Sequence, residues 1–308
     1  MNSVPVAESG QHPMDAILVR PLRFDAGRVS DGSLLWSVSK PEFSMFANAL
    51  GIHVPWFERF LVSVMRQSRE QVSSDRLRRD MRSIIGQEAN HAHAFAEWNR
   101  RLIKRYPELA ALDAKSKHHF EHLLETGSAK FKTGFVAGYE TFTFLAGLII
   151  LDRYHELMGD ADPVLRALWV WHQVEEVEHG SVAFDVFQDL HGQHEWYRKA
   201  MVLFAALHIV SETFKAYHPM VKGEGWYRSP RRAWAAWRFF AGFAFDLFWS
   251  ALPVFRRRYH PRMHPRCNGE QNRIAVAWRA WAQAGGDPTI LEAAAVDGWC
   301  ARPPNDPR

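Results

Sequence analysis

The chain has 308 residues, 47% of them hydrophobic, and a formal net charge of +4. That length can bury a sizeable core, and a mild charge without a basic stripe or a recognition motif argues against nucleic-acid binding. Cys267 and Cys300 lie far apart and form no CxxC pattern, which excludes a disulfide framework and suits a reducing cytoplasm. The N-terminus lacks a basic segment followed by an apolar run, so we expect no secretory signal.

Helical periodicity begins after residue 40. Residues 1–40 are rich in Pro, Gly, Ser and Asp and predict an arm that lies over the body. Residues 41–308 predict one all-α domain, with a core over 41–190 and a C-terminal helical extension over 191–308. The expected helices run over about 41 or 55–67, 74–106, a short segment after Pro107, 127–158, 163–190, 195–217 and 233–255, with short helices after residue 268.

The stretch Trp169–Val186, WVWHQVEEVEHGSVAFDV, places ionisable residues on a helix face that ought to be apolar. At 100° per residue, His172, Glu176 and His179 share one narrow sector, and Glu175 lies on its edge. Burying such groups without partners costs several kcal/mol each unless something binds them. A Glu-x-x-His pair that projects inward from a helix is typical of one half of a ferritin-like dinuclear metal site.

The other half is also present. The segment GQEANH holds a second Glu-x-x-His pair, Glu88 and His91, and two solitary glutamates, Glu58 and Glu140, lie on apolar helix faces. The order Glu, Glu-x-x-His, Glu, Glu-x-x-His matches the ligand set of carboxylate-bridged bundles. We therefore predict a ferritin-like four-helix bundle with additional C-terminal helices and a dinuclear metal site.

The spacing of these residues supports two antiparallel hairpins. The midpoint of Glu58 and Glu88 is residue 73, in the turn-like sequence QVSSD, and that of Glu140 and Glu176 is residue 158, in MGDADP. The first contains helix N-cap residues, and the second contains a helix stop, a cap and a proline at the first helical position. The longer segment between Glu88 and Glu140 is the crossover that ferritin-like bundles require.

The residue types favour transition metals. Four carboxylates balance two divalent cations, and imidazole favours iron, manganese or zinc over magnesium and calcium. His172 lies one turn from Glu176, so it is placed either as a third imidazole ligand or as a group behind the ligands. Glu175 could orient a ligand histidine through its free ring nitrogen. Asn99, buried on the stripe of Glu88, and Thr143, near an open metal position beside Glu140, are further supporting candidates.

The blocks VPWFERFLVSVMR, GQEANHAHAFAEWN and WHQVEEVEHGSVAFDVF resemble a bacterial family catalogued as "predicted metal-dependent hydrolase". The resemblance runs from about Ile17 to beyond Tyr259, and its most specific part is the WHxxEExEH block. The chain departs from the family at Phe57, where the family has a glycine. A more distant similarity, in the spacing of His172, Glu176 and His179, is to ferritin-like di-iron arylamine N-oxygenases. It implies a ligand set of Glu58, Glu88, His91, Glu140, His172, Glu176 and His179.

We expect a non-haem di-iron oxidoreductase that uses O₂ to oxidise a small, apolar organic substrate, with an electron donor as a further partner. Manganese or a mixed Mn/Fe pair could replace two irons. The first alternative is a dinuclear metal-dependent hydrolase, with zinc, in which the metals activate a water. The second is an iron-storage or structural metal protein, which we rank last because the added aromatic helices look like a substrate enclosure.

The segment Ala233–Phe255 is long enough to span a bilayer and is flanked by arginines on both sides. Arg238 and Asp246 lie within it, and each would cost a few kcal/mol at the centre of a membrane. We therefore expect a helix packed on the bundle that helps to enclose an apolar tunnel. The competing uses of its aromatic surface are a homodimer interface and a peripheral membrane contact.

Overall fold

A computed structural model describes residues 12–30, 34–267 and 271–301 of the chain. These residues form helices and short 3₁₀ turns, and the only β-type pairing among them is one isolated bridge between Ser37 and Ala161. The predicted all-α class is confirmed. The α-helices are α1 (Pro41–Gly51), α2 (Val54–Ser68), α3 (Asp75–Arg105), α4 (Leu109–Thr126), α5 (Ala129–Asp152), α6 (Tyr154–Met158), α7 (Pro163–His179), α8 (Val182–His191), α9 (Glu195–Gly223), α10 (Pro230–Ala251), α11 (Arg273–Gln283) and α12 (Ala293–Ala301).

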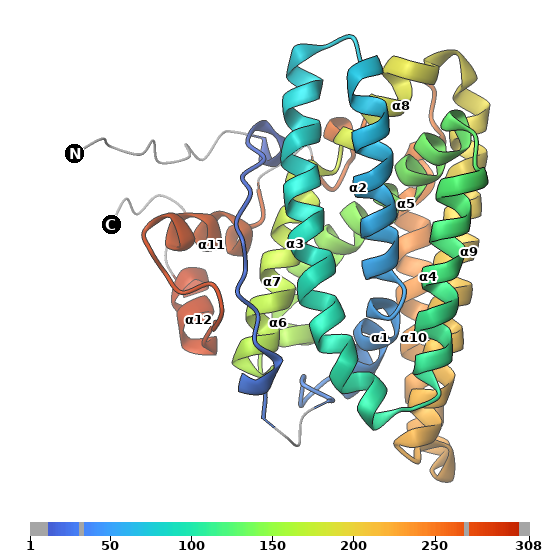
Figure 1. Cartoon of the computed structure of the whole chain (residues 1–308). Helices are drawn as coiled ribbons and strands as arrows, with labels where there is room; N and C mark the ends of the chain where they lie inside the picture. Colours follow the sequence, from blue (N-terminus) through green and yellow to red (C-terminus); the bar gives the residue numbers. More distant parts are fainter. Residues whose placement is uncertain (1–11, 31–33, 268–270, 302–308) are drawn as a thin grey trace.

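Four of these helices, α2, α3, α5 and α7, make a bundle in which α2 contacts α3 and α5, and α7 contacts the same two (Figure 1). The turns lie where the sequence predicts them. Ser74 caps α3 by accepting a hydrogen bond from Leu77 N, and Asp162 caps α7, whose first residue is Pro163. The arrangement is compatible with a ferritin-like bundle, and that finer assignment stays a prediction.

The sequence reading of one continuous helix over 163–190 is wrong. The helix breaks at Gly180 and Ser181, directly after His179, and α8 begins at Val182. Glycine and serine are weak helix formers, which favours a break at this point. Gly180 also packs tightly on α5 there, since a Cβ atom on it would lie 2.5 Å from the ring of Phe144, and this approach is at the level of the predicted metal ligands.

The helix expected to stop at residue 217 continues to Gly223, with Pro219 inside it. Tyr217, Met220 and Val221 are all buried, and the Tyr217 hydroxyl donates to the carbonyl of Ala236 on α10. Packing of this last turn against α10 holds the helix together where the proline removes a hydrogen bond.

The part of the N-terminal arm that is described, residues 12–30, runs along the bundle between α3 and the C-terminal helices α11 and α12 (Figure 1). Residues 1–11 and 31–33 of the predicted arm lie outside the described residues. Leu22, Phe24 and Val29 are buried, and the indole nitrogen of Trp171 donates to the carbonyl of Arg20. The arm thus covers a face of α7 that would otherwise meet solvent.

Within the described residues, three stretches are long and apolar enough to cross a membrane by length and composition alone: Ala129–Asp152, Pro163–Gly223 and Pro230–Phe255. The apolar window of the first is 89% buried within the molecule, whereas the windows of the other two are 33% buried. Helix α5 is therefore a core helix, while part of the surface of the other two stretches stays uncovered by the described chain.

Candidate metal centre

The seven residues predicted as metal ligands lie together in the middle of the bundle. Each is at least 94% buried, and they come from four helices: Glu58 from α2; Glu88 and His91 from α3; Glu140 from α5; and His172, Glu176 and His179 from α7. Their side chains form two groups whose facing atoms lie within 4.8 Å of one another. Glu176 belongs to both groups.

The first group consists of Glu58, His91, His172 and Glu176. His172 Nε2 lies 3.0 Å from Glu176 Oε1 and 3.5 Å from Glu58 Oε1, and His91 Nδ1 lies 3.5 Å from the same Glu176 oxygen. Two imidazoles and two carboxylates thus converge on one point.

The second group consists of Glu88, Glu140, Glu176 and His179. His179 Nε2 lies 3.0 Å from Glu88 Oε1, 3.2 Å from Glu140 Oε2 and 3.4 Å from Glu176 Oε2. This group has one imidazole where the first has two, so the two positions differ in their donors.

Two glutamates face both groups. Glu176 turns Oε1 towards His172 and Oε2 towards His179. Glu88 turns Oε1 towards His179 and Oε2 towards His91, at 3.7 Å. The glutamates of the two Glu-x-x-His pairs are therefore placed to bridge two cations, and Glu58 and Glu140 are placed at the two ends.

Many buried polar atoms at the centre face one another closely but make no well-aligned hydrogen bond. They include both oxygens of Glu58 and of Glu88, His91 Nδ1, Glu140 Oε2, His172 Nε2, Glu176 Oε2 and His179 Nε2. Such atoms destabilise a fold unless something satisfies them. Carboxylate oxygens and imidazole nitrogens that converge without partners fit a pair of metal ions, and these residues could hold them.

The pKa values describe how the protein carries this charge without metal. Burial raises the pKa of Glu58 to about 7 and that of Glu140 to about 8, so both tend to hold a proton near neutrality. Burial alone would also raise the pKa of Glu176, but His172 and His179 hold it well below its usual value. In the metal-free protein, protons therefore neutralise part of the negative charge that bound cations would otherwise neutralise.

His91 is oriented by Glu175, as the sequence predicts for that glutamate. His91 Nε2 lies 3.0 Å from Glu175 Oε2, so this nitrogen donates to the carboxylate and leaves Nδ1 free to face the first group. A carboxylate behind a ligand histidine fixes its tautomer and raises its basicity.

His179 is oriented by Gln87, which the sequence reading did not single out. Gln87 Nε2 donates to the carbonyl of Leu18 at 3.0 Å and to Glu178 at 3.3 Å, so Gln87 Oε1 must face His179 Nδ1, 2.9 Å away. His179 Nδ1 therefore carries a proton, and Nε2 faces the second group, where it could bind a cation after losing its own proton. The sequence holds no signal for this role, because Leu18 and Glu178, which fix the Gln87 amide, lie 69 and 91 residues away in the chain.

Glu178 lies off the inward face of α7, two residues after Glu176. It is fully buried, and Arg20 of the arm donates to both of its oxygens, at 2.8 and 2.9 Å. The same guanidinium lies 3.4 Å from Glu175 and stacks 5.4 Å from the ring centre of Trp278 on α11. The arm thus compensates two carboxylates that stand behind the ligand histidines.

His172 has two available roles, as the sequence indicates. The amide of Gln173 lies 2.8 Å from His172 Nδ1. When the amide nitrogen faces Nδ1, the neutral imidazole carries its proton on Nε2 and donates to the carboxylates. When the amide turns over, its oxygen accepts a proton on Nδ1, and Nε2 becomes free to bind a cation.

The remaining supporting candidates differ in position. Thr143 Oγ1 donates to Glu140 Oε1 at 3.3 Å, beside the second group. Asn99 Nδ2 donates to the carbonyl of Gly51, which joins α3 to the end of α1, and no hydrogen bond from Asn99 to a ligand occurs among the described residues. Phe57, the departure from the family pattern, stacks on Tyr139 with ring centres 3.7 Å apart, so α2 accommodates the larger side chain.

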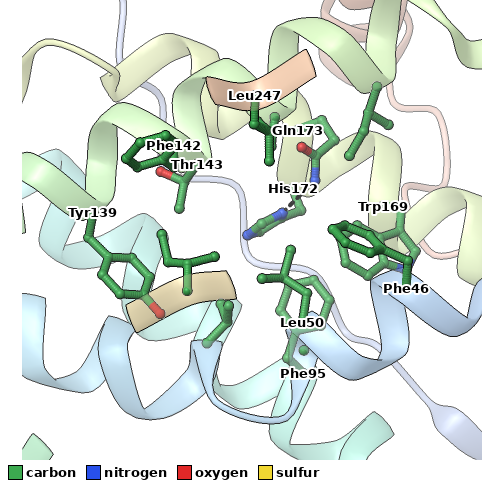
Figure 2. A pocket seen from close by; sticks show the side chains of 15 residues that line it. Phe46, Leu50, Phe95, Tyr139, Phe142, Thr143, Trp169, His172, Gln173 and Leu247 are labelled. Carbon is green, nitrogen blue, oxygen red and sulfur yellow. Dashed lines mark hydrogen bonds between the residues drawn. The ribbon is translucent and has the colours of Figure 1, made fainter. Parts of the chain in front are cut away.

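An apolar cavity of about 50 Å³ opens beside His172. Figure 2 shows the imidazole of His172 pointing into it, with Thr143, Gln173 and Tyr139 as the other polar side chains at its wall. Its apolar wall includes Phe46, Leu50, Phe95, Phe142, Trp169 and Leu247. A second cavity of about 60 Å³ shares Phe46, Phe142, Ile209 and Leu247 with the first, so the two adjoin.

The fold and the site together define an all-α protein with buried clusters of carboxylates and imidazoles that could bind metal ions. The sequence profile of a family described as "Predicted metal-dependent hydrolase" matches residues 18–265. The chain belongs to this family. No curated protein and no solved structure matches it.

Proposed function

We propose that the chain is a dinuclear-metal oxidoreductase that activates O₂ and oxidises a small, apolar organic substrate. The observation that carries the proposal is the position of seven buried potential ligands, with unpartnered donor atoms, next to a cavity walled mainly by aromatic and aliphatic side chains. Such a wall favours apolar molecules, including O₂, over polar ones.

Each ligand residue has a defined part in this proposal. Glu88 and Glu176, which face both groups, would hold both metal ions, Glu58 and Glu140 would each hold one, and His91, His172 and His179 would complete the donor set. Two ferrous ions held there would supply the electrons that reduce O₂. The four carboxylates balance the charge of two divalent cations, and manganese or a mixed Mn/Fe pair fits the same donors.

The side chains of the cavity wall and the groups that hydrogen-bond to the ligand histidines have supporting roles. Phe95, Phe142 and Trp169 exclude water from the space in front of His172, which protects reactive species from side reactions. Glu175 and Gln87 hold two ligand histidines in one tautomer. Thr143 stands beside Glu140 at the cavity wall, where its hydroxyl could donate a hydrogen bond to a bound molecule.

Hydrolysis is the second candidate because the family's description names it. Two metal ions, with zinc the natural choice, would lower the pKa of a water for attack on an ester or amide. The cavity offers few polar side chains to hold a polar leaving group, which is why we place oxidation first.

The two functions can be separated by loading the protein anaerobically with ferrous iron and mixing it with O₂. We expect two irons oxidised per chain, seen by optical spectroscopy and by Mössbauer detection, and we expect the Glu176→Gln variant to lose this reaction. Glu121→Gln, at an exposed site on α4, is the matched control and should react like the wild type.

If the ferrous protein ignores O₂ while the zinc-loaded protein cleaves esters or amides, the oxidoreductase proposal is wrong and the hydrolase is supported. If neither loaded form reacts, both enzymatic proposals fail.

A further inference from the structure

An apolar face remains exposed on α9 and α10, which pair through a short loop. On α9 the spacing of seven, four, three and four residues places one stripe on a single side of the helix. Together the two helices expose Trp196, Leu203, Leu207, Val210 and Phe214 on α9 and Trp234, Phe245, Phe248, Trp249 and Leu252 at and after α10. We call this set the α9/α10 face. Leu207 is 72% exposed and Trp249 is 63% exposed, so these side chains lie on the surface and are not the edge of the hydrophobic core.

The opposite side of α10 anchors the helix to the bundle. Ala236, Phe240, Phe243 and Leu247 are buried, and Asp246 pairs with Arg153 at the end of α5 at 3.1 Å. Asp246 is one of the two charged residues, with Arg238, that disfavour a membrane span, and this ion pair gives it a partner within the protein. The helix is therefore fixed on one side and, within the described part of the chain, uncovered on the other.

The excess of positive charge lies in the segment of the chain that contains α9 and α10. Residues 195–258 contain eleven Lys and Arg against four Asp and Glu, whereas the rest of the chain contains 27 against 30. Arginines 228, 231 and 232 precede or begin α10, arginines 256, 257 and 258 follow its end, and all six are exposed. An apolar aromatic surface with arginines at both ends is complementary to a bilayer with anionic headgroups.

The face also reaches the cavities. Val210 of α9 and Phe248 of α10 are both partly exposed, at 43% and 47%, and both line the second cavity. That cavity adjoins the one beside His172 through shared walls, including Leu247. Two small apolar cavities that share part of their walls thus lie between the face and the candidate metal centre.

We propose that the α9/α10 face docks on the surface of an anionic lipid bilayer, and that the apolar substrate passes from the bilayer between α9 and α10 into the cavities. The docking stands independently of the chemistry, while the statement about the substrate rests on the proposed function. Docking in this orientation places the opening beside Val210 and Phe248 against the lipid, so an apolar molecule need not cross water.

The test is co-sedimentation of the full-length protein with phosphatidylcholine vesicles, with and without about one-third phosphatidylglycerol. We expect strong binding to the anionic vesicles and weak binding to the neutral ones. Replacing arginines 256, 257 and 258 by Gln should weaken binding about fivefold for each charge removed, or about a hundredfold in all. The matched control replaces the exposed arginines 76, 79 and 82 of α3 by Gln, which changes the net charge equally and should leave binding nearly unchanged.

A second variant, with Phe245→Ser and Trp249→Ser, tests the apolar contribution and should also lose most of the binding without loss of fold, because both side chains are exposed. Equal reductions in the α3 control and the α10 variant would mean nonspecific charge attraction and would overturn the proposal. So would absence of wild-type binding to anionic vesicles. A wild-type dimer that the Phe245/Trp249 variant converts to monomers, without vesicle binding, would assign the face to a second copy of the chain instead.

Because binding is measured without turnover, its outcome is separate from that of the O₂ experiment. Vesicle binding by a protein that does not react with O₂ would keep the docking and remove only the proposed oxidation.

Discussion

Single atoms of Glu88 and Glu176 decide how the candidate centre is built. Each glutamate turns one oxygen to each of the two groups, and the histidines that follow them by three residues, His91 and His179, also face inward. The spacing i, i+3 puts the carboxylate and the imidazole on one side of a helix. Two such helices side by side therefore supply two carboxylates that face both groups, and two imidazoles, from only four residues.

At the same scale, Gln87 decides which nitrogen of His179 is free. Replacing Gln87 by Leu removes the acceptor for His179 Nδ1–H, so the imidazole loses its fixed tautomer and orientation. We expect metal affinity to fall by about 10- to 100-fold, measured by optical titration with Co²⁺. Gln283→Leu, on the exposed side of α11, is the matched control. A folded Gln87→Leu protein with unchanged affinity would show that Gln87 does not position His179.

At the scale of whole elements, the N-terminal arm holds α7 from outside through Arg20. The change Arg20→Gln leaves Glu178 buried, with Arg279 only at 3.7 Å and no direct guanidinium hydrogen bond. We expect a loss of about 3 kcal/mol in the free energy of unfolding, measured with urea, because breaking a buried ion pair leaves an uncompensated charge. The exposed neighbour Arg23, changed to Gln, should have almost no effect. Equal stability of the two variants would contradict this role for the arm.

The break between α7 and α8 makes a second prediction for the elements. In Gly180→Ala the new methyl group would lie 2.5 Å from the Phe144 ring, so α7 and α5 must separate beside His179. We expect a loss of about 1–3 kcal/mol in stability and a weaker metal affinity. Gly242→Ala is the matched control, since nothing lies within 4 Å of its added Cβ, and it should be neutral or stabilising by up to about 1 kcal/mol. If Gly180→Ala behaves like this control, the glycine is not needed for the close approach.

The elements also show what the sequence could and could not predict. The four candidate ligand glutamates were predictable, because each is a polar residue within an apolar stripe on its own helix and helical periodicity reveals such a residue. They are Glu58, Glu88, Glu140 and Glu176. Glu178 and Gln87 were not predictable. Every residue from Val164 to His179 is buried, so α7 has no solvent-exposed face. The pattern of polar and apolar residues therefore cannot indicate which way each side chain of α7 points. Its second face is covered by Arg20 and Trp278, which lie more than 90 residues away in the chain, and helical periodicity carries no information about such contacts.

At the scale of the whole molecule, metal uptake is coupled to proton release. Burial raises the pKa of Glu58 to about 7 and of Glu140 to about 8, and both carboxylates must lose their protons to bind a cation. The apparent metal affinity should therefore fall as the pH decreases through 8 and 7. Titration calorimetry with Mn²⁺ in buffers of different ionisation enthalpy should detect more protons released at pH 7 than at pH 9.

The variant Glu140→Gln is the control for this coupling, because it removes one group that exchanges a proton for metal. It should release fewer protons per metal at pH 7 than the wild type. Identical proton release at pH 7 and pH 9 in the wild type would mean that the buried carboxylates are already ionised in the metal-free protein.

The central claim, that the chain holds a pair of metal ions, is tested most directly by anomalous diffraction from crystals of the iron-loaded protein at the iron absorption edge. Our account predicts two anomalous peaks about 3.5–4 Å apart. One should lie among Glu58, His91, His172 and Glu176, and the other among Glu88, Glu140, Glu176 and His179. A single peak, or peaks away from these residues at saturating iron, would contradict it.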